Sequence, residues 1–300
     1  MFIVRLLLAA FLSAGLLSAQ ETAPAPIPIK VVFWNMEWFP GGDIHADARQ
    51  AKAQIALVQP ALAKMNPDII GMQEVRDWEA AEVALEKIPA VKVQVASEFL
   101  NEDGSKSTQQ LIIASRTPAI GGWWEPWKAG DTITPKRGFS FAAFEPSPGR
   151  ILLVYSIHLK SNRGDLEENT AMREESARQL TAHIAAMEKA YTGLGTVSVV
   201  VGGDFNTSID DAKFAQEKTL SILEEAGFQS SWQNMPLTER VTIPSTPSKN
   251  PNLPPWPDAT FDYIFVKGAR LINPRVEILD PAPSDHRPVV AEVELPTLAP

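Results

Sequence analysis

The sequence of 300 residues contains no cysteine, and this absence excludes several kinds of chemistry. Without a thiol there is no disulfide, no thiolate nucleophile, no zinc site built on cysteine and no lipid anchor on an N-terminal cysteine. Stability must therefore come from packing alone. Gly and Pro are not in large excess either, at 17 and 25 residues, so collagen-like and wholly disordered structures are also excluded.

Positive charge is in short supply as well. The chain has 27 Lys and Arg residues against 36 Asp and Glu residues, which gives a formal net charge of −9. Tight binding of nucleic acid through charge alone is therefore disfavoured. An enzyme that handles phosphate through a bound metal ion is not, because the cation then supplies the positive charge. The hydrophobic content of 45% is that of an ordinary soluble globular protein.

Long hydrophobic runs are absent except at the N-terminus. Arg5 is followed by an apolar run from Leu6 to Leu17 and by the small residues Ser18 and Ala19, so the pattern predicts a cleaved signal peptide over residues 1–19. A membrane anchor is disfavoured, because about a dozen apolar residues fall short of the roughly 20 that span a bilayer. We expect an exported protein, periplasmic or extracellular. Removal of Arg5 with the peptide would change its net charge from −9 to −10.

The remainder is predicted to be a flexible Pro-rich lead over residues 20–29 and a single domain over residues 30–300. Strand-like and helix-like segments alternate without an internal repeat, which favours two mixed β-sheets packed face to face with helices outside. Strands are expected at 30–39, 68–75, 91–99, 110–115, 139–144, 151–159, 196–201, 261–266, 276–279 and 289–293, and helices at 47–65, 78–88, 169–191 and 214–226.

Polar side chains follow six of these apolar strands, at the point where each strand ends or begins. They lie in the segments WNME (34–37), QEVR (73–76), SIHLK (156–160), GDFN (203–206), FDY (261–263) and SDH (284–286). A single Asn, Asp or His at such a place is usually a turn former or a structural residue, but six such coincidences are improbable. Oxygen-rich ligands with few imidazoles favour Mg²⁺, Mn²⁺ or Ca²⁺. The residues themselves thus indicate metal-assisted hydrolysis, with a phosphate ester as the favoured substrate.

These segments, read in order, resemble the endonuclease/exonuclease/phosphatase superfamily, whose members include the DNase I-like nucleases. The resemblance rests on WNMEW, IIGMQEVRD, YSIHLKSN, VVGGDFNT, FDYIFV and SDHRPVV, and it covers about residues 30–295. It implies an α/β four-layered sandwich, in which two packed mixed β-sheets are flanked by helices and the site lies at one mouth of the paired sheets. It also implies in-line attack of water on phosphorus, with Mg²⁺ (or Mn²⁺ or Ca²⁺) as cofactor.

The resemblance further implies roles for the matched polar residues. Glu74 corresponds to the principal metal ligand, and Asn35 and Asp285 to residues that support the metal or its water shell. Asp204 and Asn206 correspond to the pair that positions or activates the nucleophile and holds the phosphate.

Both histidines in these segments have counterparts in the family. His286 corresponds to the essential histidine, and Asp262 to the carboxylate that orients it. His158 matches the second histidine of the DNase I-like branch, where a Glu pairs with it, and Glu98 is the candidate partner here. Abasic-site nucleases carry a Tyr at the position of His158, so that subgroup is disfavoured.

Four basic residues are candidates for binding the substrate. Arg76 resembles a substrate-contacting Arg of the DNase I-like branch, and Arg137 is a candidate for a further phosphate contact. Lys160 and Arg163, with Asn162 between them, are particular to this chain and would form a cationic rim, although a polar loop before the next helix explains them equally well.

Two further segments carry an open question. The aromatic cluster Trp123–Trp127 would stack bases or meet a lipid surface if exposed, but such clusters more often pack beneath a loop. The Pro-rich segment Pro236–Pro257 is expected to be a surface loop, with a substrate-facing loop as the alternative.

The sequence therefore predicts an exported, divalent-metal-dependent phosphoester hydrolase, and a nuclease is favoured because His158, Glu98 and Arg76 follow the DNase I-like pattern. The alternatives are a phosphomonoesterase and a phospholipid phosphodiesterase of the sphingomyelinase kind. A non-catalytic binding module is disfavoured by the intact set of catalytic residues. The expected partner is the phosphoester substrate, and no obligate protein partner is indicated.

Overall fold

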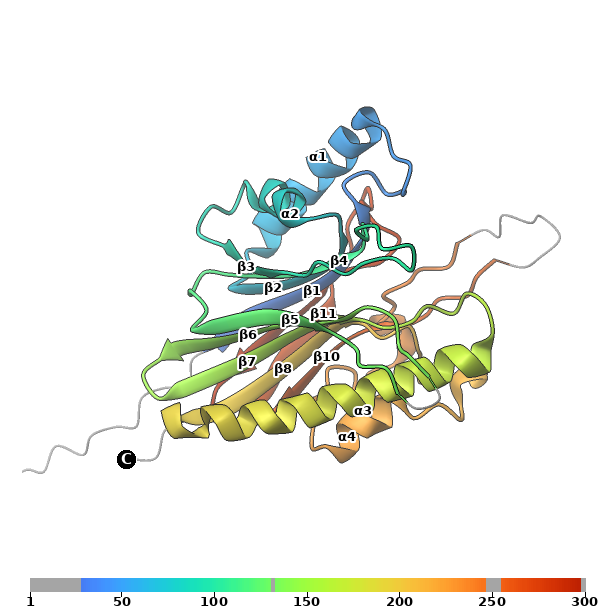
Figure 1. Cartoon of the computed structure of the whole chain (residues 1–300). Coiled ribbons are helices and arrows are strands. Elements are labelled where there is room, and N and C mark those ends of the chain that lie inside the picture. Colours follow the sequence, from blue (N-terminus) through green and yellow to red (C-terminus); the bar gives the residue numbers. More distant parts are fainter. Residues whose placement is uncertain (1–27, 131–132, 247–254, 298–300) are drawn as a thin grey trace, which may run out of the picture.

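The computed structural model describes residues 28–130, 133–246 and 255–297 (Figure 1). The predicted signal peptide, residues 1–19, lies outside the described residues, as does most of the predicted Pro-rich lead. No helix in the described ranges is long and apolar enough to cross a membrane.

Two six-stranded sheets form the centre of the molecule. In spatial order, the first contains β11 (Arg270–Val276), β12 (Val289–Glu294), β1 (Pro28–Phe39), β2 (Ile69–Val75), β4 (Gln110–Ser115) and β3 (Lys92–Ala96). The second contains β5 (Gly121–Pro126), β6 (Gly138–Ser147), β7 (Arg150–His158), β8 (Thr196–Asp204), β10 (Asp262–Lys267) and β9 (Gln229–Ser230). Each sheet mixes parallel and antiparallel pairs, such as β1 with β2 and β1 with β12.

Helices cover the outer face of each sheet, which completes four layers (Figure 1). They are α1 (Ala48–Met65) and α2 (Trp78–Leu85) on the first sheet, and α3 (Leu166–Tyr191) and α4 (Thr219–Glu225) on the second. The start of α1 is fixed by a capping box, in which the Asp47 carboxylate accepts from the Gln50 N–H at 2.8 Å and the Gln50 side chain accepts from the Asp47 N–H at 2.9 Å. The predicted four-layered α/β sandwich is confirmed.

Alternation along β1 shows how one strand serves two packing layers. Val31 and Phe33 belong to the apolar cluster between the sheets, which continues through the second sheet to α3 and α4. Val32 and Trp34 point to the other face and join the cluster beneath α1 and α2. Successive side chains of a strand point to opposite faces, so an unbroken apolar run is what a strand buried on both faces requires.

Two glycines make room for Phe33 between the sheets. A Cβ atom added at Gly71 in β2 or at Gly202 in β8 would lie 2.4 Å from a ring atom of Phe33. No ordinary packing tolerates that separation, so any larger residue at either position would push the ring or the sheets apart. The two glycines therefore set the distance between the sheets close to the residues discussed below.

Two predicted elements differ from the structure, and two strands, β5 and β9, were not predicted. The strand expected at 276–279 lies earlier, as β11, and the expected helix 214–226 is a 3-10 turn (Ala212–Phe214) followed by the shorter α4. Between them, Glu217 leaves the helical path and its carboxylate is buried. Strand β5 contains Trp123 and Trp124.

The strand directions bring one edge of both sheets together. Strands β1, β2, β7 and β8 end at this edge, and β10 begins there, since Asp262 pairs with Asp204 and His158 with Asp204. In mixed sheets of this kind the carboxyl ends of the strands are where ligands bind. The polar strand ends of the sequence are thus neighbours in space.

Candidate active site

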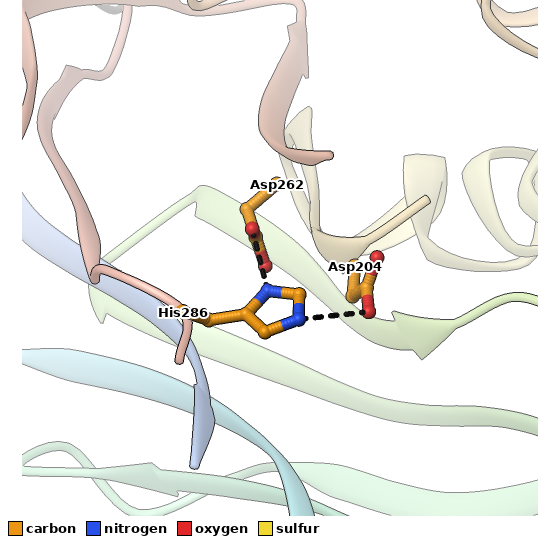
Figure 2. Close-up of side chains that lie close together, drawn as sticks. All are labelled: Asp204, Asp262 and His286. Atoms are coloured by element: carbon orange, nitrogen blue, oxygen red, sulfur yellow. Dashed lines mark hydrogen bonds and ion pairs between the residues drawn. The ribbon is translucent and has the colours of Figure 1, made fainter. Parts of the chain in front are cut away.

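A histidine held between two carboxylates lies at the centre of this edge (Figure 2). His286 Nδ1 lies 2.8 Å from Asp262 Oδ2, and His286 Nε2 lies 3.7 Å from Asp204 Oδ2. Asp204 and Asp262 are each only 1% exposed. The three residues come from β8, β10 and the segment before β12, so both sheets contribute to one group.

The pKa values of His286 and Asp204 are both raised, but by different causes. Burial alone would lower the pKa of His286, but the Asp262 and Asp204 carboxylates outweigh it and raise that pKa well above its usual range. Burial raises the pKa of Asp204 to about 7, with a further increase from Asp262, against the lowering effect of His286. The histidine is therefore held as a cation, and Asp204 titrates close to neutrality.

Asn35 and His158 bring the neighbouring Glu74 into the same cluster. Asn35 Nδ2 donates to Asp204 Oδ2 at 3.1 Å and to Glu74 Oε1 at 3.2 Å. His158 Nε2 lies 3.5 Å from Asp204 Oδ2 and 3.7 Å from Glu74 Oε1. Burial, followed by the charges of Arg137 and His286, lowers the pKa of His158 well below its usual range, so His158 is neutral.

Asn206 fixes the orientation of the Asp204 carboxylate. Its backbone N–H donates to Asp204 Oδ1 at 2.8 Å, and its Nδ2 donates to Asp204 Oδ2 at 3.0 Å and to the Leu159 carbonyl at 3.2 Å. With the bond from Asn35, both carboxylate oxygens are held, and neither can rotate away from His286. The predicted residues Asn35, Glu74, His158, Asp204, Asn206, Asp262 and His286 are thus brought together.

Several residues of the site have a left-handed backbone. The φ angles are 47° at Glu37, 49° at Trp38, 56° at Glu74 and 53° at Asn206. Only glycine and, to a smaller extent, asparagine adopt this region readily, so the conformation at Glu and Trp costs on the order of 1–3 kcal/mol per residue. The Trp38 N–H donates to Glu74 Oε2 at 3.2 Å, and this bond ties two of the strained positions together.

Glu37 is a site residue that the sequence analysis did not single out, although it lies in the WNMEW segment. Its Oε2 accepts from the Asp285 N–H at 2.9 Å. Burial raises the pKa of Glu37 to about 7, and the carboxylates of Asp285 and Glu74 add to the effect. Asp285 itself is exposed and meets the rest of the group through its backbone.

Hydrogen bonds beside these residues join the segment around Asn35 to the segment around Ser284. Trp34 Nε1 donates to the His286 carbonyl at 3.0 Å, and Ser284 Oγ donates to the Asn35 carbonyl at 2.8 Å. Gln54, from α1, donates through Nε2 to the carbonyls of Met36, Glu37 and Pro283, while its Oε1 accepts from the Gly41 N–H. Sequence patterns gave no indication of this role for Gln54, because it depends on which face of α1 meets two distant loops.

The predicted pairing of Glu98 with His158 is wrong. The Glu98 side chain is 64% exposed and forms an ion pair with Lys106 at 3.1 Å. His158 Nδ1, the atom that such a partner would contact, has no hydrogen-bond partner among the described residues. The strand that was expected to carry Glu98 ends at Ala96, and Ser97 and Phe99 on either side of Glu98 are buried against Gln110, so the Glu98 side chain points to solvent.

The four basic candidates differ in what their charged groups contact. Arg137 donates to the carbonyls of His158 and Leu159 at 3.0 and 2.7 Å, so much of its guanidinium supports the end of β7. Arg76 pairs with the adjacent Asp77 at 2.7 Å and remains half exposed. Lys160 donates to the carbonyls of Ser161 and Arg163, and Arg163 is exposed. Phosphate binding by these four residues stays a prediction.

The aromatic cluster packs within the protein. Trp123 meets Phe141 edge-on with the ring centroids 4.5 Å apart, and Trp124 meets Phe99 at 5.4 Å. Trp127 is 5% exposed. The structural interpretation of this cluster is therefore the one that the packing favours.

The sequence matches the model of the Endonuclease/Exonuclease/phosphatase family over residues 32–286, and the chain belongs to this family. Its members are enzymes that hydrolyse phosphoester bonds, and the chain is assigned that activity. No curated protein matches the chain.

Solved structures agree with this assignment at the level of the fold. An endonuclease/exonuclease/phosphatase from Beutenbergia cavernae is 19% identical with a TM-score of 0.63, and the match covers 89% of this chain and 72% of that one. The human Nocturnin catalytic domain with bound sulfate is 19% identical with a TM-score of 0.60 and coverages of 89% and 94%. TDP2 from D. rerio, complexed with a single-strand DNA product, is 18% identical with a TM-score of 0.61 and coverages of 89% and 98%.

Proposed function

We propose that this protein is a divalent-metal-dependent phosphodiesterase that directs water in line at phosphorus, with a nuclease as the favoured kind. The observation that carries the proposal is the convergence of His286 Nε2 and His158 Nε2 on Asp204 Oδ2, at 3.7 and 3.5 Å. Two imidazoles and a carboxylate that titrates near pH 7 form a group that can take up and supply protons around a phosphate.

The donor atoms of the site fit a hard divalent cation. Asp204 and Asp262 each offer a carboxylate oxygen within 4.8 Å of the other, and the Glu74 carboxylate lies beside them, joined to Asp204 through Asn35 Nδ2. Asp262 Oδ1 is buried without a hydrogen-bond partner in the described part of the chain, and a cation or its water would satisfy that atom. Oxygen-rich sets of this kind suit Mg²⁺ or Mn²⁺, and such an ion would neutralise charge on the phosphoryl oxygens.

The residues themselves divide the proton chemistry between them. Asp204, fixed by Asn35 and Asn206, accepts a proton from the attacking water, since its pKa of about 7 matches that task. His286, held as a cation by Asp262, donates from Nε2 to a phosphate oxygen. Neutral His158 contributes a further hydrogen bond at the same place.

A nucleic acid is the favoured substrate because positive charges gather on the β7 side of the site. Lys136 and Lys160 lie on this side of the site, and burial together with the charges of Arg137, Lys136 and Arg173 lowers the pKa of Lys160. Arg173 is buried and paired with Glu217, so it faces no substrate. Arg163 is exposed in the same loop as Lys160. A polyanion meets such a cluster better than a single phosphate does. The TDP2 structure with its DNA product is consistent with this choice. A phosphomonoesterase or a phospholipid phosphodiesterase remains the alternative.

A side-by-side assay tests the proposal. The protein is freed of metal with a chelator and supplied with single-stranded DNA, duplex DNA, RNA, sphingomyelin, a phosphoinositide or a phosphate monoester, with and without Mg²⁺ or Mn²⁺. We expect hydrolysis only with added metal, and fastest on a nucleic acid. Full activity in excess chelator contradicts the metal requirement, and preference for a lipid or a monoester selects the corresponding alternative.

Export is proposed from the sequence of residues 1–19 alone. Expression with the native N-terminus in a bacterial host, followed by fractionation and N-terminal sequencing, tests it. We expect protein outside the cytoplasm with residues 1–19 removed. Intact protein retained in the cytoplasm contradicts the proposal.

A further inference from the structure

A fully buried ion pair lies beside the site, among residues to which the proposed chemistry assigns no role. The Arg173 side chain, from α3, is 0% exposed and the Glu217 side chain is 2% exposed. Arg173 Nε and Nη2 contact the two carboxylate oxygens of Glu217 at 2.8 and 2.5 Å, which is a bidentate arrangement. A buried ion pair is usually no more stabilising than an apolar pair of the same volume, so packing alone gives no reason for it.

The guanidinium has an acceptor for every one of its N–H groups. Beyond Glu217 and a bond to Thr170 Oγ1, Nη1 donates to the Lys160 carbonyl at 3.0 Å and to Asn162 Oδ1 at 3.1 Å. Lys160 and Asn162 belong to the loop that follows β7 and His158. The carboxylate of Glu217 thus orients the forked guanidinium of Arg173, whose remaining N–H groups hold this loop.

Asn162 passes this constraint to the site. While its Oδ1 accepts from Arg173, its Nδ2 donates to the Asn206 carbonyl at 2.9 Å. Asn206 has a left-handed backbone and carries both bonds that orient the Asp204 carboxylate from its own side. A continuous series of hydrogen bonds therefore runs from Arg173 through Asn162 and Asn206 to Asp204.

The buried stripe of α3 that contains Arg173 is apolar toward the C-terminal end of the helix and polar near the site. Ala177, Leu180 and Ile184 are buried in the apolar core, whereas Arg173 and Asn169, one and two turns before Ala177 on that face, are buried but polar. Asn169 Nδ2 donates to the Arg163 carbonyl at 3.1 Å, in the same loop. Through Asn169 and Arg173, this polar part contacts the loop that supports Asn206.

We propose that Arg173, oriented by Glu217, is a positioning residue that holds Asn162 and thereby keeps Asn206 and Asp204 in the geometry that hydrolysis requires. This inference rests on the proposed function of Asp204 and Asn206. Arg173 touches neither substrate nor reacting atoms. A displacement of about 1 Å in such a support is enough to cost about a hundredfold in rate.

Two conservative variants test the proposal, with one matched control. Asn162→Asp keeps the acceptor for Arg173 and removes the donor to Asn206, while Arg173→Lys keeps the charge and removes the fork. Leu180→Ala shortens a buried side chain on the same helix face, remote from the loop. Each is assayed for kcat, KM and Tm on the best substrate of the wild-type protein, at saturating metal.

We expect kcat to fall about 10- to 100-fold in Asn162→Asp and in Arg173→Lys, with KM changed by less than about threefold. The double variant should be no slower than the worse single variant, because both break one series of bonds. Leu180→Ala should lower Tm while it leaves kcat near that of the wild type.

Wild-type kcat in a folded Asn162→Asp protein overturns the positioning role, whether or not Arg173→Lys folds. Loss of kcat in Leu180→Ala equal to that in Asn162→Asp also overturns it, because the effect would then follow stability alone. These outcomes require an active wild-type protein. A wild-type protein without activity on any phosphoester would overturn the proposed function instead.

Discussion

The two covering layers support the site by different means. On the first sheet, α1 supplies Gln54, a neutral amide whose bonds all go to backbone groups of β1 and of two loops. On the second sheet, α3 supplies Arg173, a cation that needs the buried Glu217 as its counter-ion. The neutral support is complete in itself, whereas the charged one fails as soon as either partner is missing. The comparison teaches that equal burial does not mean equal vulnerability.

The largest expected effect is at His286, which contacts residues of both sheets, Trp34 of the first and Asp262 of the second. His286→Ala should lower kcat/KM on a phosphodiester by about 10²–10⁴-fold or more, because it removes the cation that faces Asp204 and leaves Asp262 without its partner. Steady-state kinetics with a Tm check on the variant measures this. Activity within tenfold of the wild type would show that proton transfer is carried elsewhere.

The next largest effect concerns stability on the α3 side. Arg173→Ala should lower the free energy of unfolding by about 3–5 kcal/mol, because it leaves the Glu217 carboxylate buried and uncompensated. The double variant Arg173→Met with Glu217→Leu should recover most of that loss and still have low kcat. Urea denaturation and kinetics on the same samples measure both. A double variant as unstable as Arg173→Ala would contradict the role of the uncompensated charge.

A smaller loss is expected on the α1 side. Gln54→Ala should lower the free energy of unfolding by about 1–3 kcal/mol, because the carbonyls of Met36, Glu37 and Pro283 lose a donor but no charge is stranded. Denaturant unfolding measures it, with the exposed Arg178→Ala as a control near zero. A loss in Gln54→Ala as large as that in Arg173→Ala would remove the distinction between the two supports.

The smallest expected effect is a change with pH in the number of protons released when a metal ion binds. Asp204 has a pKa of about 7, so below pH 7 it is mostly protonated, and a cation bound beside it favours the loss of that proton. Calorimetry with Mn²⁺ in two buffers of different ionisation enthalpy should therefore show more proton release at pH 6 than at pH 8. Asp204→Asn should reduce the release. Glu37→Gln is a necessary companion, because Glu37 also has a pKa of about 7. Equal release at both pH values would contradict the raised pKa.

Much of the site could be predicted because its groups lie at the ends of apolar strands, where the local pattern is strong. The four layers follow from the same strands. Glu98 was misplaced because the pattern of β3 says nothing about where the chain turns after Ala96. β11 was misplaced because it is an edge strand with an irregular register between Ile272 and Arg275, whereas residues 276–279 have the more strand-like composition.

The supporting residues could not be predicted for a different reason. Gln54 and Arg173 act through bonds from their helices to other segments, and Asn162 acts through a bond to Asn206, 44 residues further on. A polar residue gives no local indication of such a partner. For Arg173, the spacing of residues along α3 is the one local indication. Asn169, Arg173, Ala177 and Leu180 follow one another at intervals of three or four residues, so the two polar residues share the buried face of the helix with the two apolar ones.

The bond from Trp34 to the His286 carbonyl joins residues 252 positions apart, so it can form only after nearly all of both sheets has been synthesised. A nascent chain that has not yet released residue 286 from the ribosome lacks the imidazole that the proposed mechanism requires, however well its other strands have formed. Residue 286 follows every described strand except β12, so this group is completed late along the chain. A truncation that removes only the final strand and the SDH segment would leave most of both sheets but no hydrolase.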